Sequence, residues 1–188
     1  MNETDHRSKS AERGRETLFR VSYQHQSKLI QIADYKANMI ISLSTMIISG
    51  IIAVIGYGAV SGKIGNFNLM LFIPVVGIVI ACLVSLIYAI QAARPKLLMT
   101  PDSSDTSNRS SLLFFGVISQ YNQKEYIEKM KSLLSSDSEM YEHMTIDLHN
   151  QGLILKRKYN LLVYSYQVLK YGFVINVVLF IALLMMNF

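Results

Sequence analysis

The sequence predicts an all-α membrane protein with three transmembrane helices, long helices extending into the cytoplasm and a short irregular or strand-like cytoplasmic segment. Two features predict this class: the length of the uncharged runs and the distribution of the charges. Charged side chains are absent from residues 37–62, from 64–93 and from the last 18 residues after Lys170. A helix needs about 20 mostly apolar residues to cross a bilayer. A soluble domain of 188 residues could not surround three helices that are apolar on every side.

The charges predict the orientation. Lys and Arg are concentrated before the first run and between the second and third, while Lys63 alone lies between the first two. All 13 acidic residues fall in the same two charged regions. By the positive-inside rule, the N-terminus and residues 94–167 are cytoplasmic, and the C-terminus lies outside.

Six segments follow in chain order. We expect a flexible N-terminal tail, a cytoplasmic stem helix continuous with the first transmembrane span, an external link, a second span, a cytoplasmic sensing region and a third span. Their bounds are 1–15, 16–60, 61–68, 69–93, 94–167 and 168–188. The start of the third span relative to Lys170 is left open, since a lysine can extend its ammonium group toward the headgroups.

Both stem-like helices carry an apolar stripe. The predicted stripe on the first contains Leu18, Val21, Leu29 and Ile32, with His25 on the same face. The stripe before the third span has near-heptad spacing and is interrupted around Gln151 and Gly152; it comprises Met144, Leu148, Leu155, Tyr159, Leu162, Tyr166 and Leu169. Between the spans, the run "LLFFGVIS" is broken by Gly116 and is too short for a helix of its own. It is a strand fragment, an interfacial segment or a plug among the helices.

Small residues recur at helical spacing within the spans. The first span has such a face at Ser42, Thr45, Ser49, Ala53 and Gly56, and the second at Gly77, Ala81, Ser85 and Ala89. Small side chains let helices approach closely in lipid, so we expect the two faces to pack on each other. Packing between subunits is a second use, and we expect a homo-oligomer. Asn176 should contact a neighbouring helix.

Catalytic and metal-binding patterns are weak. His143 and Asp147 lie four residues apart, near Glu142 and His149, which we interpret as a solvated helix face. We therefore expect no enzyme, no metal and no cofactor, and the single cysteine, Cys82, permits no intrachain disulfide. The net charge of +5 is explained by residues flanking the spans, and we expect no nucleic-acid partner.

Several short stretches carry a family resemblance. The motifs "IADYKANMIIS", "AARPK", "LLFFG", "YIEKMKSLL" and "LKRKYNLLVYSYQV" occur in this order. With them the chain resembles the transmembrane effector family of bacterial Pycsar anti-phage systems. The resemblance implies activation by cyclic CMP or cyclic UMP from a partner cyclase, followed by damage to the bacterial inner membrane and abortive infection. The expected partners are therefore the lipid bilayer and the cyclic pyrimidine nucleotide.

Two other functions stay open. A non-lytic membrane sensor or scaffold could recruit a cytoplasmic partner through the same helices. A membrane enzyme acting on lipid headgroups would need the cluster around His143 and Asp147 to be functional.

A nucleotide site is expected where the cytoplasmic segments meet the membrane. One phosphate charge calls for an arginine or free backbone amides, and a pyrimidine can stack on an aromatic ring. The predicted ligand-binding residues are Arg94, Lys96, Phe115, Gly116, Arg157 and Tyr159. If these residues serve only as membrane anchors, we expect the site around His25 instead.

Overall fold

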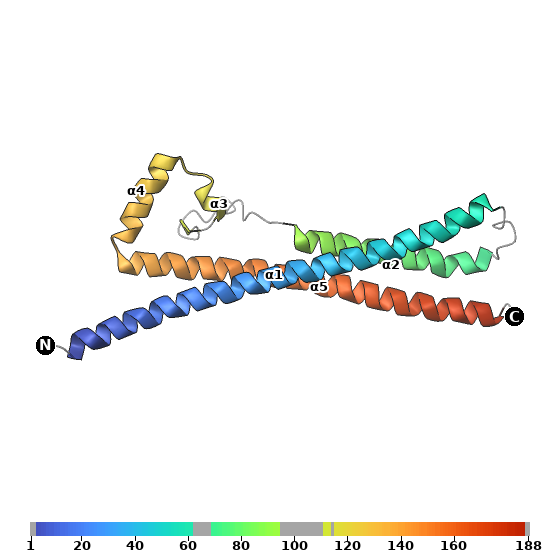
Figure 1. The fold of residues 1–188 in the computed structure, drawn as a ribbon, viewed down its shortest axis with the longest axis horizontal. Helices are drawn as coiled ribbons and strands as arrows, with labels where there is room; N and C mark the ends of the chain where they lie inside the picture. The colour runs from blue at the N-terminus through green and yellow to red at the C-terminus, as the bar shows by residue number, and fades with distance from the viewer. Residues whose placement is uncertain (1–2, 62–68, 95–110, 114, 187–188) are drawn as a thin grey trace, which may run out of the picture. The chain divides into compact units, whose positions relative to one another are not determined.

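The computed structural model describes residues 3–61, 69–94, 111–113 and 115–186. Within these ranges the chain forms five α-helices and no strand (Figure 1). Their bounds are α1 Glu3–Val60, α2 Leu69–Ala93, α3 Phe115–Ile118, α4 Gln123–Leu134 and α5 Asp137–Met186. Three of them, α1, α2 and α5, are long and apolar enough to cross a membrane. These helices agree with the predicted all-α membrane protein.

Helix α1 extends further than the sequence indicated, and α5 forms one continuous helix. Helix α1 begins at Glu3 rather than at residue 16 and ends at Val60. Helix α5 continues through Gln151 and Gly152 without a break. An internal glycine costs a helix only about 1 kcal/mol, and the packing of neighbouring residues offsets it. The interruption in the apolar pattern therefore does not interrupt the backbone.

The expected strand-like or irregular stretch is a helical turn where the structure describes it. Residues Phe115–Ile118 form α3, although the apolar run was predicted to be too short for a helix. Backbone bonds close this end of the turn, from the Gln120 amide to the Val117 carbonyl (3.1 Å) and from the Tyr121 amide to the Ile118 carbonyl (3.3 Å). Short-range bonds of this kind stabilise a single turn without a longer helix. The predicted external link beyond Ser61 and the segment around Pro95 and Pro101 lie outside the described residues.

The chain divides into two compact units that share the two longest helices. Unit 1 comprises residues 1–31 and 95–156, and unit 2 comprises 32–94 and 157–188. Each unit therefore contains one part of α1 and one part of α5. Helix α2 belongs to unit 2, whereas α3 and α4 belong to unit 1.

The core of unit 2 is built from small side chains. Ala33, Ala37 and Ile40 of α1 meet Ala89 of α2 and Leu162 of α5, and all of them are buried. Alanines at the contact let the helix backbones approach closely. Many larger apolar side chains of unit 2 remain exposed, among them Met46, Val54, Ile73, Ile87, Val178 and Met185. An apolar surface of this extent is expected of helices that face lipid.

Helices α2 and α5 pack through small and polar residues. Ser85 Oγ donates a hydrogen bond to the Ser165 carbonyl (2.9 Å), and Ser165 Oγ donates to the Ser85 carbonyl (2.7 Å). A Cβ atom added at Gly172 would lie 2.3 Å from the Ala81 Cβ, so the two helices are as close as these residues allow. The small-residue face of the second span therefore packs on α5.

The predicted contact between the two small-residue faces is wrong. On α1, Ser42, Thr45, Ser49, Ala53 and Gly56 are all exposed, and a Cβ at Gly56 would meet nothing within 4 Å. The small-residue face of α2 instead packs on α5, where Ser165 meets Ser85 and Gly172 meets Ala81. Asn176 does contact a neighbouring helix, since its side chain lies against Gly77 of α2.

The predicted stripe on α1 is displaced by about one position. Leu18 and Val21 are 63% and 54% exposed, and His25 is also exposed. The packed face instead includes the partly buried Phe19 and Gln26. The buried Ala33, Ala37 and Ile40 of unit 2 continue its seven-residue spacing. Leu29 of the predicted stripe is partly buried, and the alanines at 33 and 37 allow close approach of the helix backbones. The stripe on α5 is buried or partly buried as predicted, except for the exposed Tyr166.

Candidate ligand groove

The six predicted ligand residues are distributed over both units. Arg94 follows α2 and Arg157 lies on α5, both exposed in unit 2. Tyr159 packs against the unit 2 core, and Lys36 Nζ lies 5.9 Å from its ring centroid. Phe115 and Gly116 form part of α3 in unit 1. Lys96 lies outside the described residues. Within the described part of the chain, no hydrogen bond or ring contact joins Arg94 to Arg157 or Tyr159, and this site stays a prediction.

Unit 2 contains an ion pair that the sequence analysis missed. Lys158 of α5 donates a hydrogen bond to the Asp34 carboxylate of α1, and Lys158 is only 8% exposed. Asp34 follows the buried Ala33, and Lys158 precedes the buried Leu162 by four residues. The sequence could have indicated this ion pair, because Asp34 and Lys158 each lie close to a residue of the buried packing face.

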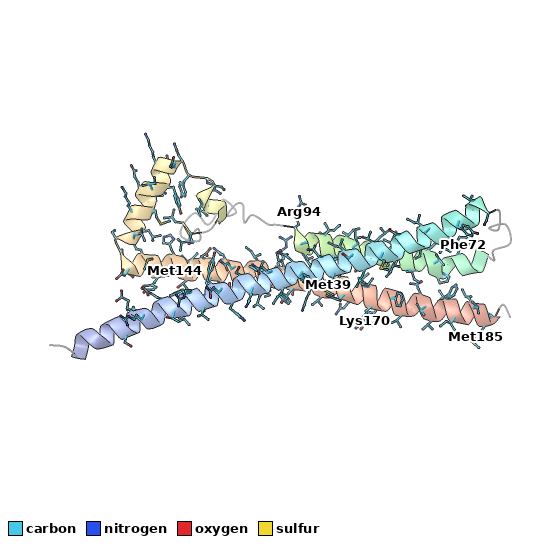
Figure 2. All side chains as sticks on the ribbon, viewed as in Figure 1. Met39, Phe72, Arg94, Met144, Lys170 and Met185 are labelled. Atoms are coloured by element: carbon cyan, nitrogen blue, oxygen red, sulfur yellow. The ribbon has the colours of Figure 1, made fainter. Side chains whose placement is uncertain are left out.

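Unit 1 contains a groove between α1 and α5. Its volume is about 610 Å³, within the usual range for small-molecule sites. Figure 2 labels Met144, which is part of the α5 wall. Both helices present residues spaced three or four apart, so each wall is one helix face. The groove is lined by Glu16, Phe19, Arg20, Tyr23 and Gln24 from α1, by Leu113, and by Met140, Tyr141, Met144, Asp147 and Leu148 from α5.

Aromatic rings and an arginine gather at one side of this groove. Phe19 and Tyr141 stack with their ring centroids 5.6 Å apart and an interplanar angle of 29°. The Arg15 guanidinium lies 5.3 Å from the Tyr141 ring centroid, and Arg20 lines the groove itself. A second cavity of about 510 Å³ shares Phe19 and Tyr141 as lining residues. Rings of this kind can stack on a flat ligand, and a guanidinium can pair with an anion.

Asp147 is the one acidic residue among the α5 residues that line the groove, and it is 4% exposed. Its Oδ2 accepts a hydrogen bond from Gln151 Nε2 (3.2 Å), whereas Oδ1 has no partner among the described residues. Burial raises the pKa of the Asp147 carboxyl, and the bond from Gln151 opposes this shift. A buried acceptor without a donor costs about 1–3 kcal/mol, so Oδ1 is an unsatisfied acceptor in a residue that lines the groove.

The interpretation of the His143 and Asp147 region as a solvated helix face is wrong for these two residues. Asp147 is buried, and His143 is partly buried because its Nδ1 accepts a hydrogen bond from the Leu112 amide (3.3 Å). This bond holds residues 111–113 on α5 and places Leu113 in the groove wall. Glu142 and His149 are exposed. Within the described residues, no group of three His, Cys, Asp or Glu residues could hold a metal ion.

The groove residues could have been found from one sequence signal. Phe19 and Tyr23 of α1, like Tyr141, Met144 and Leu148 of α5, have helical spacing and large side chains in otherwise polar stretches. The sequence could not show that these two stretches, more than 100 residues apart, face each other. That pairing is a property of the tertiary structure.

Comparison with known protein families identifies the family to which the chain belongs. The family model described as the Pycsar effector protein domain matches residues 18–186. This match begins on α1 at the position next to Phe19, includes α2, α3 and α4, and ends with α5. No curated protein and no solved structure matched the chain. Because the match covers nearly the whole sequence and ends with the last of the three helices suited to a membrane, the chain belongs to the Pycsar effector protein family.

Proposed function

We propose that this protein is a membrane effector of anti-phage defence, activated by a cyclic pyrimidine nucleotide, cyclic CMP or cyclic UMP. On activation it impairs the integrity of the bacterial inner membrane, and the infected cell stops growing before phage mature. A partner cyclase supplies the nucleotide. The observation that carries this proposal is the match to the Pycsar effector family over residues 18–186, together with three helices suited to a bilayer.

The continuity of two helices supports a route from ligand to membrane. Helices α1 and α5 each contribute to unit 1, which contains the groove, and to unit 2, which contains the apolar helices. A ligand can shift a conformational equilibrium only if it binds one state more tightly than the other. A ligand held between α1 and α5 would favour one arrangement of this pair, and the unbroken backbone extends into unit 2.

A homo-oligomer is part of the proposal. Three spans leave too little protein to enclose a water path within one subunit. The exposed small-residue face of α1 includes Ser49, Ala53 and Gly56, and none of the described residues of unit 2 covers it. Such a face suits close contact between helices in lipid, here between subunits.

Vesicle leakage tests the proposal. The purified full-length chain is reconstituted into vesicles of bacterial lipid that contain a self-quenching dye, and cyclic CMP or cyclic UMP is added. We expect one of the two to release the dye, whereas cyclic AMP at the same concentration does not. Protein-free vesicles control for leakage caused by the nucleotide itself.

The other outcomes favour the alternatives. Nucleotide binding without dye release would favour a non-lytic sensor or scaffold. Turnover of headgroups, followed by mass spectrometry of the extracted lipid, would favour a membrane enzyme. Either result would overturn the lytic part of the proposal.

A further inference from the structure

The Asp147 carboxylate is an unsatisfied acceptor in the wall of a ligand-sized groove. It is nearly fully buried, and Gln151 already occupies Oδ2, but Oδ1 receives no hydrogen bond from any described residue. Buried polar atoms in folded proteins are almost always paired. An unpaired one that lines a groove indicates which kind of group the groove takes. Here that group is a hydrogen-bond donor.

Two more acceptors next to Asp147 also lack donors. Gln151 Oε1 and Gln26 Oε1 are buried and unpaired among the described residues. Gln151 is bonded to Asp147, and the Gln26 side chain packs near Gly152, with Nε2 3.9 Å from the position of a Cβ there. All three unpaired oxygens therefore come from adjacent turns of α5 and the α1 residue packed on them. This part of unit 1 has an excess of acceptors.

The rest of the groove suits a nucleotide. Tyr23 and the stacked pair of Phe19 and Tyr141 line the groove as aromatic surface for a pyrimidine, and Arg20 offers a guanidinium for the single negative charge of a cyclic phosphate. Stacking alone does not choose between bases, since every base has a flat face. The choice between cytosine and uracil is made at the base edge.

At that edge, cytosine has a hydrogen-bond donor at position 4, whereas uracil has an acceptor. Cytosine presents an amino group at position 4, which donates hydrogen bonds, and carboxylates accept from this group when proteins read DNA. Uracil presents a carbonyl oxygen at the same place, and its one N–H group lies between two carbonyl oxygens. A carboxylate that meets the group at position 4 is therefore repelled by the uracil oxygen there, whereas the cytosine amino group donates to it.

We propose that the groove between α1 and α5 binds the activating nucleotide and that Asp147 accepts a hydrogen bond from an amino group on the base. The ligand class is therefore a cyclic nucleotide with a cytosine-type, amino-bearing pyrimidine. This inference rests on the proposed function and names the ligand for it. It leaves the family assignment and the proposed effect on the inner membrane unchanged.

Isothermal titration of the full-length chain in detergent tests the inference with cyclic CMP and cyclic UMP. For the unsubstituted chain we expect cyclic CMP to bind about tenfold or more tightly than cyclic UMP, the discrimination typical of one good base-edge contact. Asp147→Asn has the same shape but adds a donor, so the preference should disappear or reverse. Glu142→Gln removes a charge from an exposed site on the same helix and should leave both affinities unchanged. Circular dichroism checks that each variant remains helical.

The possible failures are distinguishable. If the unsubstituted chain binds neither nucleotide, the proposed function fails and the inference fails with it. If it binds cyclic UMP as tightly as cyclic CMP, or if Asp147→Asn keeps the full preference, the inference is overturned and the proposed function stands. The first of these comparisons needs no substitution, so a misfolded variant does not remove the test.

Discussion

Lys158 of α5 donates a hydrogen bond to Asp34 of α1, and this ion pair joins the two shared helices within unit 2. The two partners differ in burial, since the side chain of Lys158 is 10% exposed and that of Asp34 is 40% exposed. Removing the carboxylate leaves a nearly buried ammonium group without a partner. Removing the lysine leaves a carboxylate that water can still reach.

The unequal burial predicts an order of stabilities. Asp34→Ala should destabilise the protein by about 1–3 kcal/mol, between the values for exposed and buried pairs. Lys158→Met should cost less, because an apolar chain of similar length replaces the buried charge. Thermal unfolding in detergent, followed by circular dichroism, measures both. Equal losses, or a larger loss for Lys158→Met, would contradict the idea that the buried ammonium group depends on Asp34.

Close packing at Gly172 predicts a second contrast. A Cβ at Gly172 would lie 2.3 Å from the Ala81 Cβ, which cannot rotate away, so Gly172→Ala should force α2 and α5 apart and cost about 1–3 kcal/mol. Gly56→Ala is the matched control, because a Cβ there meets nothing within 4 Å and alanine favours the helix. Thermal unfolding in detergent should separate the two variants. Equal stability would contradict the α2–α5 contact.

The charge distribution predicts the topology. Residues 1–36 and 94–167 should be cytoplasmic, with the C-terminus outside, because nearly all of the basic residues lie in these two regions and Lys63 alone lies in the link between the first two spans. A reporter that is active only outside the inner membrane, fused after Phe188, should be active. The same reporter fused before Met1 is the inactive control. Activity at the N-terminus and none at the C-terminus would invert the topology.

The buried carboxyl predicts a pH dependence. Because burial raises the pKa of Asp147 in the folded state, folding favours its protonated form. The folded state should therefore lose stability as the pH rises from about 4 through the raised pKa, and gain it as the pH falls. Asp147→Asn should flatten this dependence, measured as the free energy of unfolding in detergent at each pH. Glu16 and Arg20 line the same groove and His143 lies one turn away, so Glu16→Gln is the control for other titrating groups.

The residues predicted from the sequence allow a direct comparison of two ligand sites. If the nucleotide binds where the spans end, Arg94→Ala and Arg157→Ala should each weaken binding without preventing membrane insertion. If it binds in the groove, Arg20→Ala should weaken binding and the other two should not. Titration of the three variants in detergent, with membrane fractionation as the insertion control, decides between the sites. Normal affinity in all three would exclude both phosphate contacts.

Parts of the candidate site were visible in the sequence and parts were not. Tyr159 lies on an apolar stripe of α5, and its burial follows from that spacing. Phe19 was missed because Leu18 and Val21 suggested a different face, although both are exposed in the structure. Asp147 was interpreted as solvated because carboxylates in polar stretches usually are. Its burial depends on α1, which a local pattern of α5 does not describe.

The sequence by itself determined the all-helical class and the three helices that are long and apolar enough to cross a membrane. Uncharged runs of this length would expose too much apolar surface to water, and a helix satisfies their backbone hydrogen bonds within a bilayer. Only the tertiary structure decided which helices pack together. Small residues indicate which face of a helix can approach another helix closely, but they do not indicate which helix that is. Ser85 of α2 forms hydrogen bonds with Ser165 of α5 and does not pack on the small-residue face of α1. Partner choice follows from spacing and hydrogen bonding on both helices at once, which no single stretch of the chain contains.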